Sequence, residues 1–159
     1  MYNIGQIFSK KYPPEAAIWC NRNNAYIVQI EGGYQIKEIP APSLDKVKEE
    51  KINALKEQRD LLEKEPVEYN GRLFDFDDKS QSRIRNAIVA LESAGGDAFC
   101  SWTCADNTEA IVTAGDLRAV IVNGSVRSST LHGAYNVAKE TVLSADTIEA
   151  VNAVTMEVL

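Results

Sequence analysis

The residues of this chain that could carry catalysis are few. The chain has one histidine, His132, which closely follows the hydroxyl run Ser128–Thr130. A histidine base beside a serine nucleophile would be the arrangement of a hydrolase. Neighbouring residues on a helix do not face one another, however, and no nucleophile-elbow motif is present. The pattern therefore favours a surface or interface histidine over a hydrolase.

A cluster of aspartates could bind a metal ion. Asp75, Asp77 and Asp78 resemble the start of a calcium-binding loop. Such a loop needs a glycine at its sixth position and a glutamate at its twelfth, where this chain has Ser80 and Asn86. The start of a helix follows at once, so we interpret these carboxylates as helix caps.

The cysteines do not form a recognisable site. Three are present, Cys20, Cys100 and Cys104, and an odd number excludes a full disulfide framework. On a strand, Cys100 and Cys104 would share one face with Trp102 between them. A zinc site there would need two further ligands, and the histidine is distant in sequence. We expect reduced, buried thiols, and a redox role for Cys100 and Cys104 stays open.

The glycines do not form a phosphate-binding loop. Gly95-Gly96 and Gly124 are not followed by Gly-Lys-Ser or Gly-Lys-Thr. We expect these glycines to end helices. The sequence therefore predicts no catalytic residue, no cofactor and no metal.

Composition and charge exclude further classes of protein. The chain has 159 residues, of which 45% are hydrophobic and 25% charged, as in an ordinary globular protein. It has no apolar run of about 20 residues, and its beginning lacks the layout of a signal peptide. Residues 97–159 carry three basic and eight acidic side chains, which would repel a phosphate backbone. We expect a cytoplasmic protein with no membrane span and no nucleic-acid partner.

The first 42 residues predict a small module of one helix and one β-hairpin. Pro13 and Pro14 suit the first turn of a helix. Tyr26, Val28 and Ile30 alternate along the strand that follows and share one face. A hairpin this small cannot bury both faces within its own module. It should therefore pack on something else.

A long charged helix is predicted after the connector Pro40–Ser43. Residues 44–64 contain neither glycine nor proline and would form about 32 Å of helix. Ile52, Leu55 and Leu62 form a narrow apolar stripe, which Arg59 interrupts. Two interpretations stay open: a solvated linker helix with one side on a domain, or a helix for self-association.

The remaining residues, 66–159, predict a compact domain with two β-hairpins and about four helices. Asn70-Gly71 suits the type I′ turn of the first hairpin. The second hairpin is predicted from the strands Phe99–Thr103 and Glu109–Val112. The helices are predicted at Lys79–Ser93, from Thr113 to a break at Asn123-Gly124, at Ser128–Leu143, and after a cap at Asp146. Thr113 and Asp116 would form a capping box. The predicted fold class is α+β, divided at 1–42, 43–65 and 66–159.

Large aromatic and aliphatic side chains on the front module and the long helix are the candidates for partner binding, because such residues dominate interfaces. They are Trp19, Tyr26, Val28, Ile30, Tyr34, Ile52, Leu55 and Leu62.

Several of these motifs resemble those of small bacteriophage and prophage tail-region proteins. The matching stretches are Pro13–Ala17, Trp19–Asn21, Gln35-Ile36, Ile39–Pro42, Asn70-Gly71, Phe74-Asp75, Ser80-Gln81, Ile84, Trp102, Asp106-Asn107, Val112-Thr113 and Asp116-Leu117. The resemblance covers nearly the whole chain and is to a domain family of unknown function often encoded near tail-fibre genes. Its motifs are structural, so it implies a genome neighbourhood rather than an activity.

The resemblance implies a structural or interaction protein that binds other tail or tail-fibre proteins, with a homo-oligomer as an option. Such a protein would be made in the cytoplasm of the bacterial host and could remain in the virion tail. A tail-fibre assembly chaperone that is absent from the mature particle is the alternative. A small enzyme or a nucleic-acid-binding regulator is a further alternative, against which the lone histidine and the missing basic face count.

Overall fold

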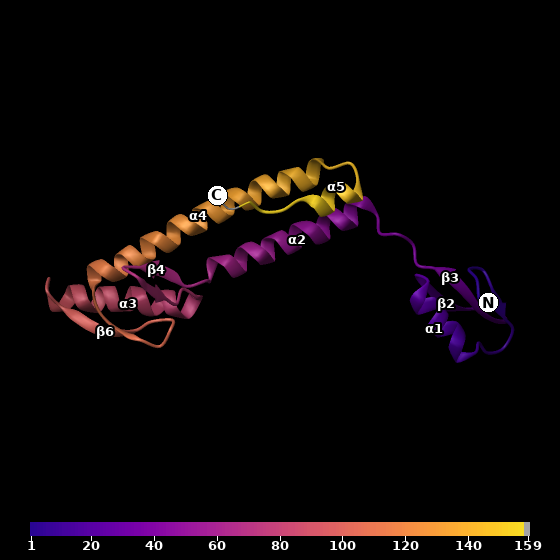
Figure 1. Cartoon of the computed structure of the whole chain (residues 1–159), viewed down its shortest axis with the longest axis horizontal. Coiled ribbons are helices and arrows are strands. Elements are labelled where there is room, and N and C mark those ends of the chain that lie inside the picture. The colour runs from indigo at the N-terminus through magenta and orange to yellow at the C-terminus, as the bar shows by residue number, and fades with distance from the viewer. Residues whose placement is uncertain (158–159) are drawn as a thin grey trace. The chain divides into compact units, whose positions relative to one another are not determined.

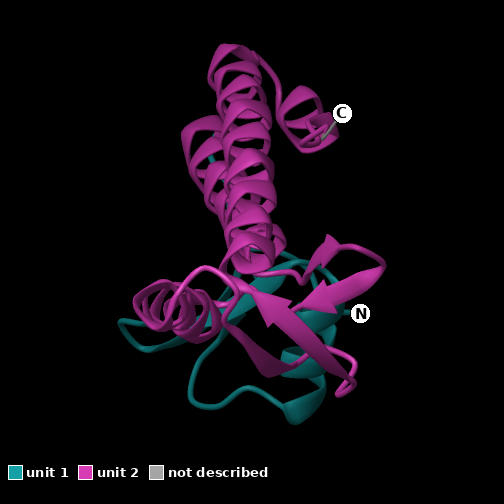
Figure 2. Cartoon of the chain, turned by 90° about the vertical axis from the view of Figure 1, so that its left-hand side faces the viewer, with its two compact units in different colours: residues 1–43 teal, residues 44–159 magenta. Residues whose placement is uncertain are grey.

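The computed structural model describes residues 1–157 and divides the chain into two compact units, Met1–Ser43 and Leu44–Leu159 (Figures 1 and 2). The described residues form five helices and three small antiparallel sheets, none of which closes into a barrel. The predicted α+β class is confirmed. The helix predicted for segment 43–65 is present as Leu44–Glu63, and it belongs to the second unit instead of forming a separate part.

The first unit is a three-stranded sheet with one helix. Its elements are β1 (Ile7–Phe8), α1 (Pro14–Arg22), β2 (Ala25–Ile30) and β3 (Gly33–Glu38). The strands lie in the order β1-β3-β2, so the short β1 adds to the free edge of the predicted hairpin. The core is small and consists of Cys20, Ala25 and Ile36, with larger side chains packed around it.

The second unit contains four helices and two hairpins. Its elements are α2 (Leu44–Glu63), β4 (Val67–Tyr69), β5 (Arg72–Phe74), α3 (Asp78–Ala94), β6 (Phe99–Thr103), β7 (Glu109–Thr113), α4 (Ala114–Ser144) and α5 (Ile148–Ala153). The two longest helices, α2 and α4, run side by side, and the hairpins and α3 gather at one end of the pair (Figure 1).

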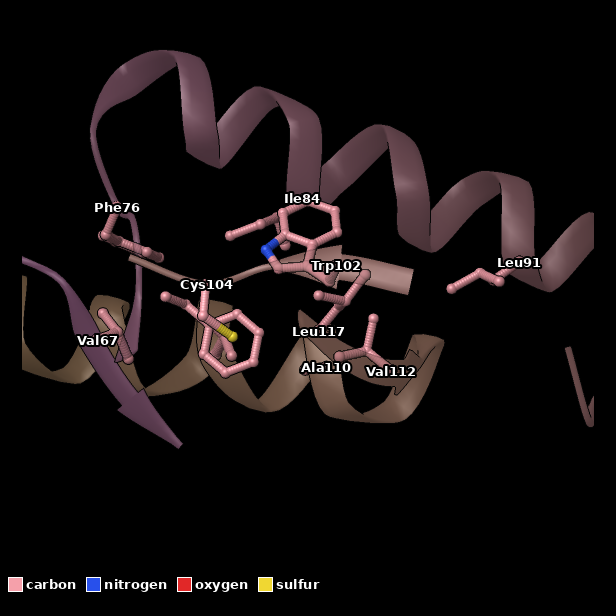
Figure 3. Close-up of a cluster of buried hydrophobic side chains, with 11 residues drawn as sticks. Val67, Phe76, Ile84, Leu91, Trp102, Cys104, Ala110, Val112 and Leu117 are labelled. Carbon is pink, nitrogen blue, oxygen red and sulfur yellow. The ribbon is translucent and has the colours of Figure 1, made fainter. Parts of the chain in front are cut away.

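Two hydrophobic cores hold the second unit together. One joins α3, both hairpins and the first half of α4, and includes Phe74, Ile84, Trp102 and Leu117 (Figure 3). The other joins α2, the second half of α4 and the C-terminal segment around Val151. The second core packs α2 on α4 from Val47 to Leu62, and the first core packs α3 and the hairpins on the first half of α4.

The structure corrects the predicted break at Asn123-Gly124. α4 runs without interruption from Ala114 to Ser144. Gly124 is buried, and a Cβ added to it would overlap the ring of Phe76. The glycine therefore admits a core side chain instead of ending the helix. Residues 66–157 consequently hold three helices, where about four were predicted.

Local turn and cap signals are mostly confirmed. Asn70 and Gly71 have φ angles of 50° and 73°, as a type I′ turn requires. Thr113 and Asp116 form the predicted capping box. α5 is capped by Thr147, whose hydroxyl accepts a hydrogen bond from the Ala150 amide at 3.1 Å. The prediction of Asp146 as that cap is wrong by one residue, because the helix begins at Ile148.

Candidate protein-docking surface

The first unit has one covered and one uncovered sheet face. α1 packs on the covered face through Ala16 and Cys20, which meet Ala25 and Ile36. Side chains alternate along a strand, so Tyr26, Val28 and Ile30 point the other way. No helix of the unit packs on that side. Three of the predicted partner-binding residues therefore lie together on the uncovered face.

A fourth apolar residue, Ile7, extends this face. Ile7 of β1 pairs with Gln35, which pairs on its other side with Val28. Ile7 is 60% exposed and Tyr26 is 43% exposed, whereas Val28 and Ile30 are half-buried. We call Ile7, Tyr26, Val28 and Ile30 the apolar sheet face. The polar residues that β3 adds to it are Gln35 and Lys37.

Sequence reasoning missed Ile7 because its strand is only two residues long. The signal that could have revealed it is the second glycine of the Gly32-Gly33 turn. A Cβ on Gly33 would overlap the carbonyl oxygen of Phe8. Such a close backbone approach needs a glycine and brings β1 onto the edge of β3.

The other two candidates of the front module lie on the covered side. Trp19 packs against the small core of Cys20, Ala25 and Ile36. Tyr34 pairs with Phe8 across the sheet, and its ring lies 5.1 Å from that of Tyr12 in an edge-to-face arrangement. Both side chains contribute to packing within the unit, apart from the apolar sheet face.

The apolar stripe of α2 is used inside the second unit. Leu55 is 3% exposed and belongs to a core that includes Leu131 of α4. Ile52 and Leu62 are half-buried against the same core. The interpretation of this stripe as a self-association surface is therefore corrected, since α4 occupies it. Arg59, which interrupts the stripe, lies 4.8 Å from the ring centre of Tyr135.

His132 and the serines do not form a nucleophile–base pair. His132 Nε2 lies 3.1 Å from Glu63 Oε1, and the Ser128 hydroxyl donates to the same oxygen at 2.5 Å. A carboxylate thus stands between them, where a hydrolase needs direct contact between serine and histidine. The arrangement fastens α4 to the end of α2.

The aspartate cluster caps a helix, as the sequence indicated. Asp77 accepts a hydrogen bond from the Ser80 amide at 2.7 Å, and this bond lowers the pKa of Asp77. Asp78 pairs with Lys64 across 3.3 Å. Within residues 1–157 no three histidine, cysteine, aspartate or glutamate side chains are grouped to hold a metal ion.

The three cysteines are free thiols. Trp102 of β6 and Cys104, one residue beyond the end of β6, are buried in the core (Figure 3). Cys100 packs against the same core but is half-buried, so the expectation of a buried thiol is corrected for Cys100. Among residues 1–157 no helix is both long and apolar enough to span a lipid bilayer.

Comparison with protein families gives one match. A family model described as a domain of unknown function, DUF4376, matches residues 46–155. The matched region starts within α2 and ends after α5, so it covers most of the second unit and leaves the apolar sheet face outside. No curated protein and no solved structure matches the chain.

Proposed function

The chain belongs to the DUF4376 family, and we propose that it is a tail-associated protein of a phage or prophage that acts by binding other tail or tail-fibre proteins. The family description assigns no activity to the domain. The tail setting rests on the resemblance of motifs spread along the chain. The binding role rests on the apolar sheet face of the first unit.

The apolar sheet face supports binding because its exposure is costly for so small a unit. The unit has 43 residues and four buried hydrophobic side chains, Ala16, Cys20, Ala25 and Ile36. Removing apolar surface from water gains about 25 cal/mol per Å². A partner that covers Ile7 and Tyr26 would therefore stabilise the complex and the unit together.

The chemistry of the second unit also favours binding over catalysis. His132 and Ser128 of α4 both contact the Oε1 atom of Glu63 in α2 and so bridge two helices. Cys104 lies within the core, and Cys100 packs against it. A protein whose reactive side chains serve packing acts through its surfaces.

The experiment is the recovery of full-length variants in purified particles from the phage or induced prophage that encodes the chain. Ile7→Glu puts a charge on the apolar sheet face at a residue that is 60% exposed, so the monomer should still fold. Ile18→Glu is the matched control, because Ile18 is 51% exposed on α1 of the same unit. Mass spectrometry of the particles should show the control at the wild-type amount and Ile7→Glu strongly reduced.

Two outcomes would contradict the proposal. Equal recovery of both variants would remove the apolar sheet face as the docking element. If the wild-type protein is absent from particles, and fibres fail to assemble without it, the protein is a fibre-assembly chaperone instead. Pull-down with the isolated fibre protein then distinguishes the two variants in the same way.

A further inference from the structure

The side of α4 that faces away from α2 is unusually apolar. Val122 and Val126 on this side are 57% and 62% exposed, and Val137, which also lines a cavity beside Val154, is 70% exposed. A helix that lies on a domain normally turns charged residues to solvent. α4 instead carries exposed valines opposite its buried face, which includes Val120, Leu131 and Ala138.

This outer face lacks charge over most of its length. Between residues 119 and 139 the exposed positions of α4 are Val122, Asn123, Ser125, Val126, Ser129, Thr130, His132, Gly133, Asn136 and Val137, of which His132 lies toward α2, where it contacts Glu63. The exposed charged residues of α4 are Arg118 at one end of this stretch and Glu140 at the other. The face is therefore neutral in the middle and oppositely charged at its ends.

Positions spaced like those of a coiled-coil seam run along the outer face, and two of them, Val122 and Val126, are apolar. Val122, Val126, Ser129, Gly133, Asn136 and Glu140 follow one another at alternating intervals of four and three residues. Intervals of this kind average 3.5 residues and keep one stripe directed at a partner helix. With Arg118 included, the stripe is about 33 Å long.

We propose that the outer face of α4 binds the outer face of α4 in a second copy of the chain, antiparallel, with Ser129 at the two-fold axis. Arg118 and Glu140 are each 11 residues from Ser129, so the antiparallel pairing brings Arg118 of each copy to Glu140 of the other. A parallel pairing would place like charges together. The charge pattern thus selects both the partner and its direction.

The side-chain sizes fit the same arrangement. About the axis at Ser129, Val126 of one copy comes opposite position 132, next to Gly133, in the other, and Val122 comes opposite Asn136. A Cβ added to Gly133 would have no atom within 4 Å in its own chain, so the space above this glycine is open. A valine from the second copy can fill it. Small residues at these positions let the two helices approach closely.

The charges at the ends also remain usable in the dimer. Arg118 already pairs with Glu92 of α3. A guanidinium group has five N–H donors and can serve a second carboxylate. Glu140 makes no ion pair with any other residue in the range 1–157. A standard protein–protein complex buries about 800 Å² on each partner, and a single helix face buries less than that. We therefore expect a reversible dimer.

Sedimentation of the purified full-length protein over a range of concentrations tests the proposal without any tail component. The wild type should pass from monomer to dimer as concentration rises. Val126→Glu should remain monomeric with an unchanged circular dichroism spectrum. Val89→Glu is the matched control, because Val89 is a helix valine on α3 with the same 62% exposure, and it should dimerise like the wild type.

A charge exchange tests the direction of pairing. Glu140→Arg should weaken the dimer by about tenfold, because two attractive pairs become repulsive. Arg118→Glu combined with Glu140→Arg should restore it. Ser129→Cys should give a covalent dimer on mild oxidation, whereas Ser82→Cys, exposed on α3, should not.

Two sets of results would contradict the proposal, one concerning the surface that pairs and the other the direction of pairing. A wild type that stays monomeric at every concentration, or a Val126→Glu variant that still dimerises, rules out pairing through the outer face of α4. Dimerisation without restoration by the charge exchange and without cross-linking at Ser129 rules out the antiparallel arrangement.

Discussion

Packing decides the role of Gly124 at the scale of a single residue. Its missing side chain leaves room for the Phe76 ring, which is buried between α3 and α4. We predict that Gly124→Ala lowers the free energy of unfolding by about 1–3 kcal/mol, although alanine is the better helix former. Denaturant titration followed by circular dichroism measures the change.

Gly115 provides the control for this substitution. It also lies in α4, but the nearest atom to an added Cβ is the Thr113 hydroxyl oxygen, at an ordinary contact distance of 3.5 Å. Gly115→Ala should therefore leave stability unchanged or raise it slightly. Equal effects at the two glycines would mean that Phe76 moves away freely.

The capping box at the start of α4 makes stability depend on pH. The Thr113 hydroxyl and amide donate to Asp116, and Tyr69 adds a third hydrogen bond. These bonds lower the pKa of Asp116 below its ordinary value of 3.8. Because the folded pKa is the lower one, the stabilisation is fully present above the unfolded pKa. It is lost as pH falls through the folded pKa.

We therefore predict that Asp116→Asn costs about 1 kcal/mol of unfolding free energy at pH 7, typical of a lost helix cap. The difference from wild type should shrink below about pH 4 as Asp116 takes up a proton. Urea titrations at pH 7 and at pH 3 measure it. Asp97→Asn, at an exposed turn, is the control and should show no difference at pH 7. A cost that is equal at both pH values would argue against the carboxylate.

Local elements were readable from the sequence, and non-local contacts were not. The turn at Asn70-Gly71 and the cap at Thr113 depend on backbone geometry over a few residues, so residue type revealed them. The continuity of α4 depends on Phe76, which lies 48 residues before Gly124. Which side of α2 is exposed to solvent likewise depends on which side packs on α4. These choices are made by tertiary packing, which periodicity alone does not contain.

The candidate partner-binding residues also fall into those that local sequence predicted and those that tertiary packing decides. Tyr26, Val28 and Ile30 were found because strand alternation is local. Ile7 belongs to the apolar sheet face because β1 pairs with β3, which the sequence did not reveal. Leu55 is excluded from the partner-binding residues because α2 packs on α4. A stripe of hydrophobic residues shows that a helix face is covered, but it does not show by what.

Arg127 is the contact that joins the elements at the end of α2. Its guanidinium donates to the carbonyl oxygens of Glu63, Glu65 and Pro66 at 3.0, 2.6 and 3.0 Å, and lies 5.5 Å from the Phe76 ring centre. It thereby satisfies carbonyl groups at the end of one helix from the middle of another. Its partial burial lowers the pKa of Arg127.

We predict that Arg127→Ala lowers the free energy of unfolding by about 2–4 kcal/mol, because three carbonyl groups lose their donor and the side chain loses its packing on Phe76. Arg127→Lys should recover only part of this, since one ammonium cannot reach three carbonyls in a fork. Arg85→Ala, on the exposed side of α3, is the control. Thermal unfolding compares the three. Full stability in Arg127→Lys would mean that only the charge matters.

The whole molecule combines two units of different character. The second unit has two cores and contains the whole family match, residues 46–155. The first has a small core and carries the apolar sheet face outside that match. The unit with the least internal packing thus presents the apolar sheet face, while the outer face of α4 belongs to the larger unit. Binding to another protein and binding to a second copy would use separate parts of the chain.

The connector between the units should be the first site of proteolysis. Residues Pro40, Ala41, Pro42 and Ser43 have no helix or strand assignment and are all exposed. Proteases cut most readily in exposed segments outside helices and strands. We predict that brief treatment with proteinase K yields a lasting fragment that begins near Leu44, while the 43-residue front unit, with its small core, is degraded further. Mass spectrometry of the time course identifies the ends. A first cut within α3 or α4 would show that the second unit opens before the connector is reached.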